Sequence, residues 1–133
     1  MIYFDTSVVL AALLNETKRP SPSFWVTDTG SSTKTSSRLL EYEVVVRLNA
    51  LKKSPKAIQS ALDFLDGVDL IDMEPAALES ALKPFPVSVR TLDAIHLSTM
   101  MFLRARGVAV SLATYDVRME RAAKAIGFQI AKL

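Results

Sequence analysis

The sequence predicts an α/β fold, a three-layer α/β/α sandwich with a mainly parallel central sheet. Short apolar segments with the pattern of strands alternate with longer helical segments along the chain, and this alternation is typical of strand–helix–strand units. The chain has 133 residues, 50% of them hydrophobic, which is enough for one core. We therefore expect one domain over residues 1–133, without an internal repeat.

The first strand and helix are expected in the opening segment, MIYFDTSVVLAALL. Residues 1–4 have the composition of a short buried strand. Asp5, Thr6 and Ser7 then offer N-cap side chains, so a helix over residues 7–15 is expected. A buried, unpaired carboxylate costs several kcal/mol, so the acid in this apolar segment must be solvated, paired or metal-bound.

Segment 18–37 is the least regular part of the chain, because it contains two prolines, a glycine and many hydroxyl residues. A short helix near residues 23–29 and a short strand near 33–36 would fit. Phe24 and Trp25 could be exposed contacts for a partner or part of the core, and the sequence leaves both alternatives open.

The middle of the chain is predicted to form two helices and a strand. Residues 38–53 read as a helix with an apolar stripe whose members lie four or three positions apart. The stripe consists of Leu40, Val44, Leu48 and Leu51. Pro55 indicates a break, after which residues 56–65 form a second amphipathic helix and residues 68–73 form a strand.

The last part of the chain is predicted to form three helices and two strands. The helices are expected at 75–82, 91–106 and 115–126, and the strands at 108–113 and 128–131. Pro75 suits the first turn of its helix, Pro84 and Pro86 mark a loop, and Gly107 ends the long helix.

The composition restricts the class of protein. The net charge is +2, from 16 basic and 14 acidic residues, which permits a polyanionic partner without requiring one. The absence of cysteine excludes disulfides and thiolate metal sites and suits a reducing compartment. The N-terminus does not have the pattern of a signal peptide, and the apolar run 8–14 is too short to cross a bilayer. We expect a cytoplasmic protein without a membrane segment.

Three acids lie where strands or loops lead into helices. Asp5 ends the first strand and Asp116 follows strand 108–113, so both are expected at the carboxyl edge of the sheet, where ligands bind in such folds. Asp93 lies in the first turn of an apolar helix and could reach that edge. Each acid alone could be an ordinary helix N-terminal residue. Together, with no cysteine and one histidine, they favour Mg²⁺ or Mn²⁺ over zinc, and phosphoryl-transfer chemistry.

Four segments then carry a resemblance to a known family. They are YFDTSVVLAALL, TSSRLLEYEVVVRL, RTLDAIHLSTMMFL and LATYDVRMERAAKAIGF. By these segments, which span nearly the whole chain, the sequence resembles the PIN-domain ribonucleases and, among them, the VapC-type toxins of type II toxin–antitoxin systems. The resemblance implies a Mg²⁺-dependent endoribonuclease that cleaves RNA with metal-activated water, a VapB-type antitoxin that inhibits it, and homodimerisation.

The resemblance also assigns site residues. The catalytic carboxylates would be Asp5, Glu43, Asp93 and Asp116. Asp5 and Asp93 would bind the metal directly, and Asp116 directly or through water. Glu43 would support the site or bind a second metal. The choice of Glu43 over Glu41 rests on the resemblance alone, since both lie on partly apolar helix faces.

Several polar residues are expected around these acids. Thr6, Ser7 and Thr114 are candidate supporting residues, although N-capping would also explain the first two. His96, the only histidine, is interpreted as a partly buried, hydrogen-bonded side chain. Contact with substrate or pairing with a carboxylate stays open for it.

Three arginines are candidates for binding RNA phosphates: Arg90, Arg38 and Arg118. Arg90 is the strongest of them because it directly precedes the helix that contains Asp93. A solvated surface charge is the alternative for each. No aromatic stripe that could stack single-stranded bases is visible.

Three other functions share features with this sequence. A signalling receiver domain needs adjacent acids after the first strand, whereas Asp5 is followed by threonine and serine. A PIN-like module that binds RNA or protein without catalysis is disfavoured by the complete set of acids. An RNA-processing PIN nuclease outside any toxin pair is the remaining alternative.

Overall fold

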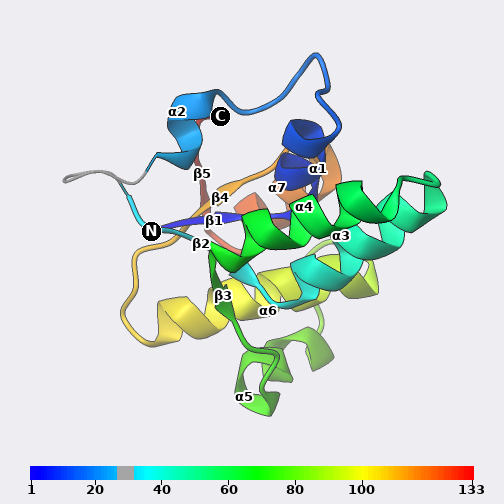
Figure 1. Ribbon diagram of the computed structural model, residues 1–133. Coiled ribbons are helices and arrows are strands. Elements are labelled where there is room, and N and C mark those ends of the chain that lie inside the picture. Colours follow the sequence, from blue (N-terminus) through cyan, green and yellow to red (C-terminus); the bar gives the residue numbers. More distant parts are fainter. Residues whose placement is uncertain (27–31) are drawn as a thin grey trace.

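The computed structural model describes residues 1–26 and 32–133. In these residues a five-stranded sheet has the order β3-β2-β1-β4-β5, and every neighbouring pair is parallel (Figure 1). The strands are β1 (Ile2–Phe4), β2 (Lys34–Ser37), β3 (Asp69–Ile71), β4 (Ser111–Ala113) and β5 (Gln129–Ile130). The predicted α/β fold with a mainly parallel sheet is confirmed.

Helices connect the strands. They are α1 (Thr6–Leu13), α2 (Pro22–Trp25), α3 (Leu39–Ala50), α4 (Pro55–Asp66), α5 (Pro75–Leu78), the 3₁₀ helix η1 (Glu79–Leu82), α6 (Thr91–Ala105) and α7 (Val117–Ala125). The helix predicted over 75–82 is thus an α-helical turn followed by a 3₁₀ turn. The helix predicted near 23–29 ends at Trp25, and its positions 27–29 lie outside the described residues. No helix in the described part of the chain has the length and apolar character needed to cross a membrane.

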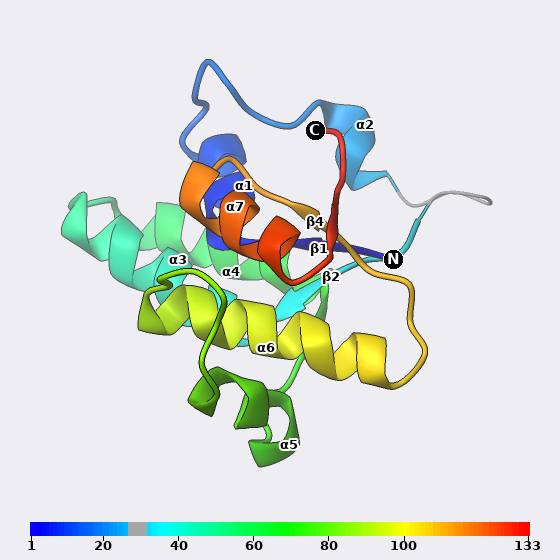
Figure 2. The same cartoon turned by 180° about the vertical axis from the view of Figure 1, so that it is seen from behind.

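Two apolar layers sandwich the sheet. Tyr3 and Phe4 are both fully buried and, as consecutive strand residues, point to opposite faces. Phe4 packs with residues of α1, α2, α3 and α4, whereas Tyr3 packs with residues of α6 and α7. Figure 1 shows α3 and α4 in front of the sheet, and Figure 2, from behind, shows α6 and α7. The sheet is therefore the middle layer of three.

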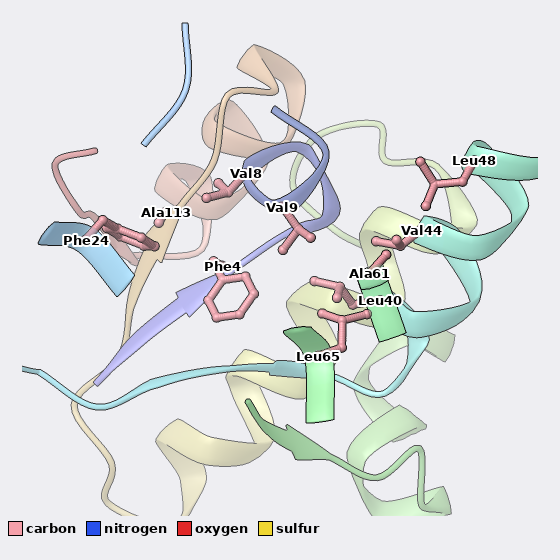
Figure 3. Packing of buried hydrophobic residues seen from close by; sticks show 10 residues of the cluster. All are labelled: Phe4, Val8, Val9, Phe24, Leu40, Val44, Leu48, Ala61, Leu65 and Ala113. Carbon is pink, nitrogen blue, oxygen red and sulfur yellow. The ribbon is translucent and has the colours of Figure 1, made fainter. Parts of the chain in front are cut away.

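One position of the predicted apolar stripe on α3 is wrong. Leu40, Val44 and Leu48 are buried in the cluster around Phe4 (Figure 3), but Leu51 is 40% exposed. The helix ends at Ala50, and Leu51 is its C-cap residue. The stripe stops there because residues three or four positions apart share a face only while the helix continues.

The aromatic residues of α2 belong to the core rather than to an exposed contact surface. The Trp25 ring lies edge to face with Phe24, Phe64 and Phe4, at centroid distances of 4.8, 5.0 and 5.4 Å. Phe24 is buried in the same cluster, where Figure 3 shows it near Phe4 and Ala113. Edge-to-face pairs at these distances are favourable. The contacts therefore tie segment 18–26 to β1 and α4.

Replacing Trp25 with alanine is expected to lower the free energy of unfolding by about 3 kcal/mol, the low end of the range for large aromatic residues, because the ring is only partly buried. Urea unfolding followed by circular dichroism would measure this, since the variant lacks the only tryptophan. Trp25→Phe, which keeps an aromatic ring, should lose less than half as much. A loss below about 1 kcal/mol in the alanine variant would contradict the core assignment.

Candidate active site

The site lies where the order of the strands changes direction. From β1 the chain moves to β2 and β3 on one side, and then to β4 and β5 on the other. Ligands in open α/β sheets bind beyond the carboxyl ends of strands at such a point. Phe4 of β1 pairs with Ala113 of β4, so Asp5 and Thr114 follow side by side at this edge.

Asp5 is a buried carboxylate with three hydrogen bonds. It is 6% exposed, and its Oδ1 accepts from the Ser7 backbone N–H at 3.1 Å and from Ser7 Oγ at 2.6 Å. Its Oδ2 accepts from Thr114 Oγ1 at 2.7 Å. Burial raises the pKa of Asp5 although these donors oppose the shift. Asp5 is also the N-cap of α1, so the N-cap interpretation of this acid is correct as far as it goes.

Thr114 and Ser7 link Asp5 to Asp116. Thr114 Oγ1 accepts from the Asp116 backbone N–H at 2.9 Å, and Ser7 Oγ accepts from the Tyr115 N–H at 2.9 Å. The predicted supporting residues Ser7 and Thr114 therefore hold the ends of β1 and β4 together. The chain after β4 is fixed relative to Asp5 by these bonds.

Asp116 is the N-cap of α7. Its Oδ1 accepts from the backbone N–H groups of Arg118, at 2.8 Å, and Met119, at 3.4 Å. The Arg118 guanidinium lies 3.4 Å from Oδ2. Partial burial acts to raise the pKa of Asp116, but the bonds and charge of Arg118 outweigh it and the pKa is lowered.

Glu43 reaches the same edge from α3. Its Oε2 accepts from Thr6 Oγ1 at 2.5 Å and lies 2.6 Å from His96 Nε2. Burial alone would raise the pKa of Glu43, but His96 and Thr6 outweigh it and the pKa is lowered. Glu41, the alternative acid, is paired with Arg38 at 3.1 Å instead. The structure thus places Glu43, and not Glu41, beside Thr6, the residue that follows Asp5.

Asp93 approaches from the first turn of α6. It is half-buried, and burial is the largest reason that its pKa is raised; the charge of Asp116 is the next. Arg118 and His96 oppose this shift, and Glu43 adds to it. Asp93 is therefore close enough to two other carboxylates to feel their repulsion.

The donor chemistry of the site fits a hard divalent cation. Burial raises the pKa of both Asp5 and Asp93. Neither carboxylate forms an ion pair with lysine or arginine in the described residues. Carboxylate oxygens are the ligands that Mg²⁺ and Mn²⁺ prefer. Within residues 1–26 and 32–133, no three acidic or histidine side chains are yet arranged as a metal cluster. Asp116 is instead turned toward the start of α7.

A cationic pocket of about 420 Å³ opens beside Asp93. Its lining residues come from the loop before α6, from α6 and from α7: Pro86, Val87, Ser88, Val89, Arg90, Asp93, Arg118 and Arg121. Two of the predicted RNA-binding residues, Arg90 and Arg118, are among them. Arg121 was missed by the sequence analysis, although its spacing of three from Arg118 places both on one face of a helix.

Arg38, the third predicted RNA-binding residue, lies elsewhere. Its guanidinium bonds Asp72 at 2.7 Å and Glu41 at 3.1 Å. These two acids already satisfy much of its charge. The structure therefore brings Arg90, Arg118 and Arg121 together and leaves Arg38 outside the pocket.

His96 is 3% exposed and bonded through both ring nitrogens. Its interpretation as a buried, hydrogen-bonded histidine is correct, and so is the open alternative that it pairs with a carboxylate. The second partner, the Tyr3 hydroxyl at 2.6 Å from Nδ1, was not predicted. A buried tyrosine usually needs a partner for its hydroxyl group, and this was the available signal.

Comparisons with known proteins find similarity over nearly the whole chain. The family model described as PIN domain matches residues 2–125. "Ribonuclease VapC46" of Mycobacterium tuberculosis (strain H37Rv) is 32% identical over 130 residues, 97% of this chain and 95% of that protein. "Ribonuclease VapC47" of M. tuberculosis (strain CDC 1551) is 28% identical over 129 residues, covering 96% and 93%. "Ribonuclease VapC35" of the same strain is 28% identical over 131 residues, covering 98% and 95%.

Proposed function

Because the chain belongs to the PIN domain family, we propose that it is an endoribonuclease that hydrolyses RNA phosphodiesters with a divalent cation, Mg²⁺ or Mn²⁺. The observation that carries the proposal is that Asp5, Glu43 and Asp116 are tied by hydrogen bonds to the chain at the strand-order change, and that Asp93 feels the charges of Asp116 and Glu43. The names of the similar mycobacterial proteins support a ribonuclease.

Each carboxylate has a separate role in this proposal. Asp5 and Asp93 would hold the cation, with Asp116 contributing directly or through water. The cation, when bound, supplies stabilisation of charge on the phosphate and lowers the pKa of water. Ser7 and Thr114 fix the Asp5 carboxylate for this task by their hydrogen bonds.

Glu43 would act on the attacking water. Its Oε2 is used by Thr6 and His96, whereas its Oε1 has no hydrogen-bond partner among the described residues. Because the pKa of Glu43 is lowered, the group is a carboxylate at neutral pH. Oε1 can therefore accept a hydrogen bond from the water and orient it.

The direct test is cleavage of a total small-RNA pool in Mg²⁺, in Mn²⁺ and in EDTA. Cleavage in either metal, lost in EDTA, would support the proposal, and the cut sites would identify the target. Equal cleavage in EDTA would refute the metal-dependent mechanism. Binding of RNA without cleavage in either metal would favour the non-catalytic module.

The arginine pocket beside Asp93 would hold an RNA phosphate. Arg90→Gln and Arg121→Gln are each expected to raise KM about 3–10-fold and to reduce the slope of log K against log salt by about one, with little change in kcat. Neither arginine forms an ion pair in the described part of the chain, so each is free to bind phosphate. Steady-state cleavage of a short RNA at several salt concentrations measures both effects.

Arg106→Gln is the matched control. It removes the same charge from the other end of α6, where Arg106 lies over the Phe102 ring. A helix of this length separates its ends by about 20 Å, so the control should leave KM and the salt slope unchanged. If all three variants weakened binding equally, the pocket would have no special role.

We further propose that the chain acts as a toxin, inhibited by a VapB-type antitoxin, and that it forms a homodimer. The support is the similarity to proteins named VapC. Induced expression should arrest growth, and co-expression of a short reading frame directly upstream should relieve the arrest. Expression without arrest would favour an RNA-processing nuclease outside any toxin pair. Light scattering of the purified chain tests the homodimer.

A further inference from the structure

A chain of polar side chains runs beneath the proposed active site. The Tyr3 hydroxyl lies 2.6 Å from His96 Nδ1, and His96 Nε2 lies 2.6 Å from Glu43 Oε2. Tyr3 is 0% and His96 3% exposed, so neither can touch an RNA strand. Only Glu43, at the end of the chain, is partly open to solvent. In the described residues, the hydrogen bonds of Tyr3 and His96 therefore reach the site through Glu43.

One order of donors and acceptors satisfies every contact in this series of hydrogen bonds. A carboxylate can only accept, so His96 Nε2 must carry the hydrogen that points to Glu43. At the other end, the Ser37 backbone N–H donates to the Tyr3 hydroxyl oxygen at 3.1 Å. The Tyr3 phenol can then donate its own hydrogen to His96 Nδ1, which lies 2.6 Å away. The Tyr3 contact thereby favours the ring form that donates through Nε2.

These hydrogen bonds hold the flexible Glu43 side chain between separate elements of the fold. A free glutamate rotates about three side-chain bonds, and ordering the side chain costs the entropy of these rotations. Glu43 of α3 is already held on one oxygen by His96 of α6 and by Thr6 of α1. Tyr3 of β1 holds His96 in turn, with the two rings edge to face at 5.8 Å. Groups that orient a reactive residue in this way preorganise the site.

We propose that Tyr3 and His96 are positioning residues that hold the Glu43 carboxylate in a single orientation in the site. The proposal rests on the proposed function, since Glu43 is a residue of that site. It assigns a task to the only histidine and to a tyrosine that the carboxylate mechanism does not use.

The protein offers a spectroscopic test of this proposal that needs no enzymatic activity. His96 is the only histidine, so an untagged chain labelled with ¹⁵N-histidine gives the signals of one imidazole ring. The expected spectrum shows hydrogen on Nε2, without rapid exchange between tautomers, in the wild type. Tyr3→Phe should shift the Nδ1 signal or restore exchange. A neutral ring with its hydrogen on Nδ1, or a freely exchanging ring in the wild type, would overturn the proposal.

Kinetics test whether the chain positions Glu43. Tyr3→Phe is expected to lower kcat about 10-fold and His96→Leu up to about 100-fold, with KM changed less than two-fold, as for outer partners of catalytic sites. His96→Gln keeps an N–H near the place of Nε2 and should recover part of the loss. In a Glu43→Gln background, Tyr3→Phe should cause no further loss, because the two act through one group. An unchanged kcat in folded Tyr3→Phe, or an equal further loss in the Glu43→Gln background, would refute the proposal.

Ser98→Ala is the matched control for structural damage. Ser98 is buried on the same helix, but it bonds the Ala77 carbonyl at 2.7 Å and the Ala81 N–H at 3.1 Å, away from Glu43. It should lower Tm without a change in kcat. If Ser98→Ala lowered kcat as much as Tyr3→Phe at an equal loss of Tm, the effect of Tyr3 would be structural and the proposal would fall.

The two proposals fail in different ways. A wild-type chain that cleaves no RNA but has hydrogen fixed on His96 Nε2 would refute the nuclease and leave the positioning of Glu43 intact. A wild-type chain that cleaves RNA with a freely exchanging His96 ring would do the reverse.

Discussion

Replacing Asp5 with asparagine is expected to lower RNA cleavage by at least about 100-fold, because even outer partners of a metal site contribute 10–100-fold and Asp5 is proposed to bind the cation directly. Asparagine keeps one oxygen for Ser7 and places an NH₂ group beside Thr114 Oγ1. That hydroxyl oxygen can accept as well as donate, so the local geometry is preserved. The loss should therefore come from charge and not from misfolding.

The stability of the same variant follows from the sign of the pKa shift. Burial raises the pKa of Asp5, which means that the folded chain disfavours its charged form. A group of this kind destabilises the native state fully at pH values above its folded pKa; the cost shrinks as the pH falls below that value and is gone below the unfolded pKa. Removing the charge should therefore leave Tm at neutral pH unchanged or slightly higher. Thermal unfolding in EDTA, followed by circular dichroism, would show it.

Metal binding provides the second measurement on Asp5→Asn. A ligand that binds only the native state raises its apparent stability, so Mg²⁺ or Mn²⁺ should raise the Tm of the wild type and have a much smaller effect on the variant. Asp66→Asn makes the same charge change at an exposed position of α4 and should behave as the wild type. An Asp5→Asn variant that cleaves RNA as well as the control would refute the assignment of Asp5.

The location of the site at the sheet edge was predictable because it follows from parallel strands alone. Asp5 and Asp116 come after two apolar strands, and the carboxyl ends of parallel strands share one edge. The strand order, which makes β1 and β4 neighbours, could not be predicted in this way. It depends on how the connecting helices cross over the sheet, and a local sequence pattern does not reveal this. Helix periodicity could not choose between Glu41 and Glu43 for the same reason, and the prediction of Glu43 rested on the resemblance. The choice depends on where α3 lies relative to Thr6, a long-range contact.

The hydrogen-bonded chain beneath the site was harder to foresee. Tyr3 and His96 are 93 positions apart, and each alone fits an ordinary buried position. Their pairing arises because one face of β1 packs on α6.

The strands are shorter than their predicted ranges, and a 3₁₀ turn follows α5 where a continuous helix was predicted, for a related reason. Apolar patterns mark what is buried, whereas strand ends depend on whether a neighbouring strand is present to pair with.

Replacing Asp93 with asparagine is expected to separate catalysis from RNA binding. Cleavage should fall by at least about 100-fold, for the same reason as with Asp5. Asp93 also lines the arginine pocket, where its negative charge opposes an incoming phosphate. Removing one charge at close range should tighten RNA binding by roughly two- to five-fold at moderate salt. Filter binding of a short RNA in EDTA, beside cleavage in Mg²⁺, measures the two effects independently.

Two opposing effects determine the stability of Asp93→Asn. An acid in the first turn of a helix gains about 0.3–1 kcal/mol from the helix dipole, and the variant loses this. However, burial and then the charge of Asp116 raise the pKa of Asp93, so its surroundings as a whole disfavour the charge. The variant should therefore be at least as stable as the wild type in EDTA.

Glu120→Gln is the control, because it alters a first-turn acid of α7 that is paired with Lys124. It should lose a few tenths of a kcal/mol of stability and cleave RNA normally. Weaker RNA binding by Asp93→Asn would contradict the placement of Asp93 beside the phosphate pocket, because a lost negative charge cannot repel a polyanion.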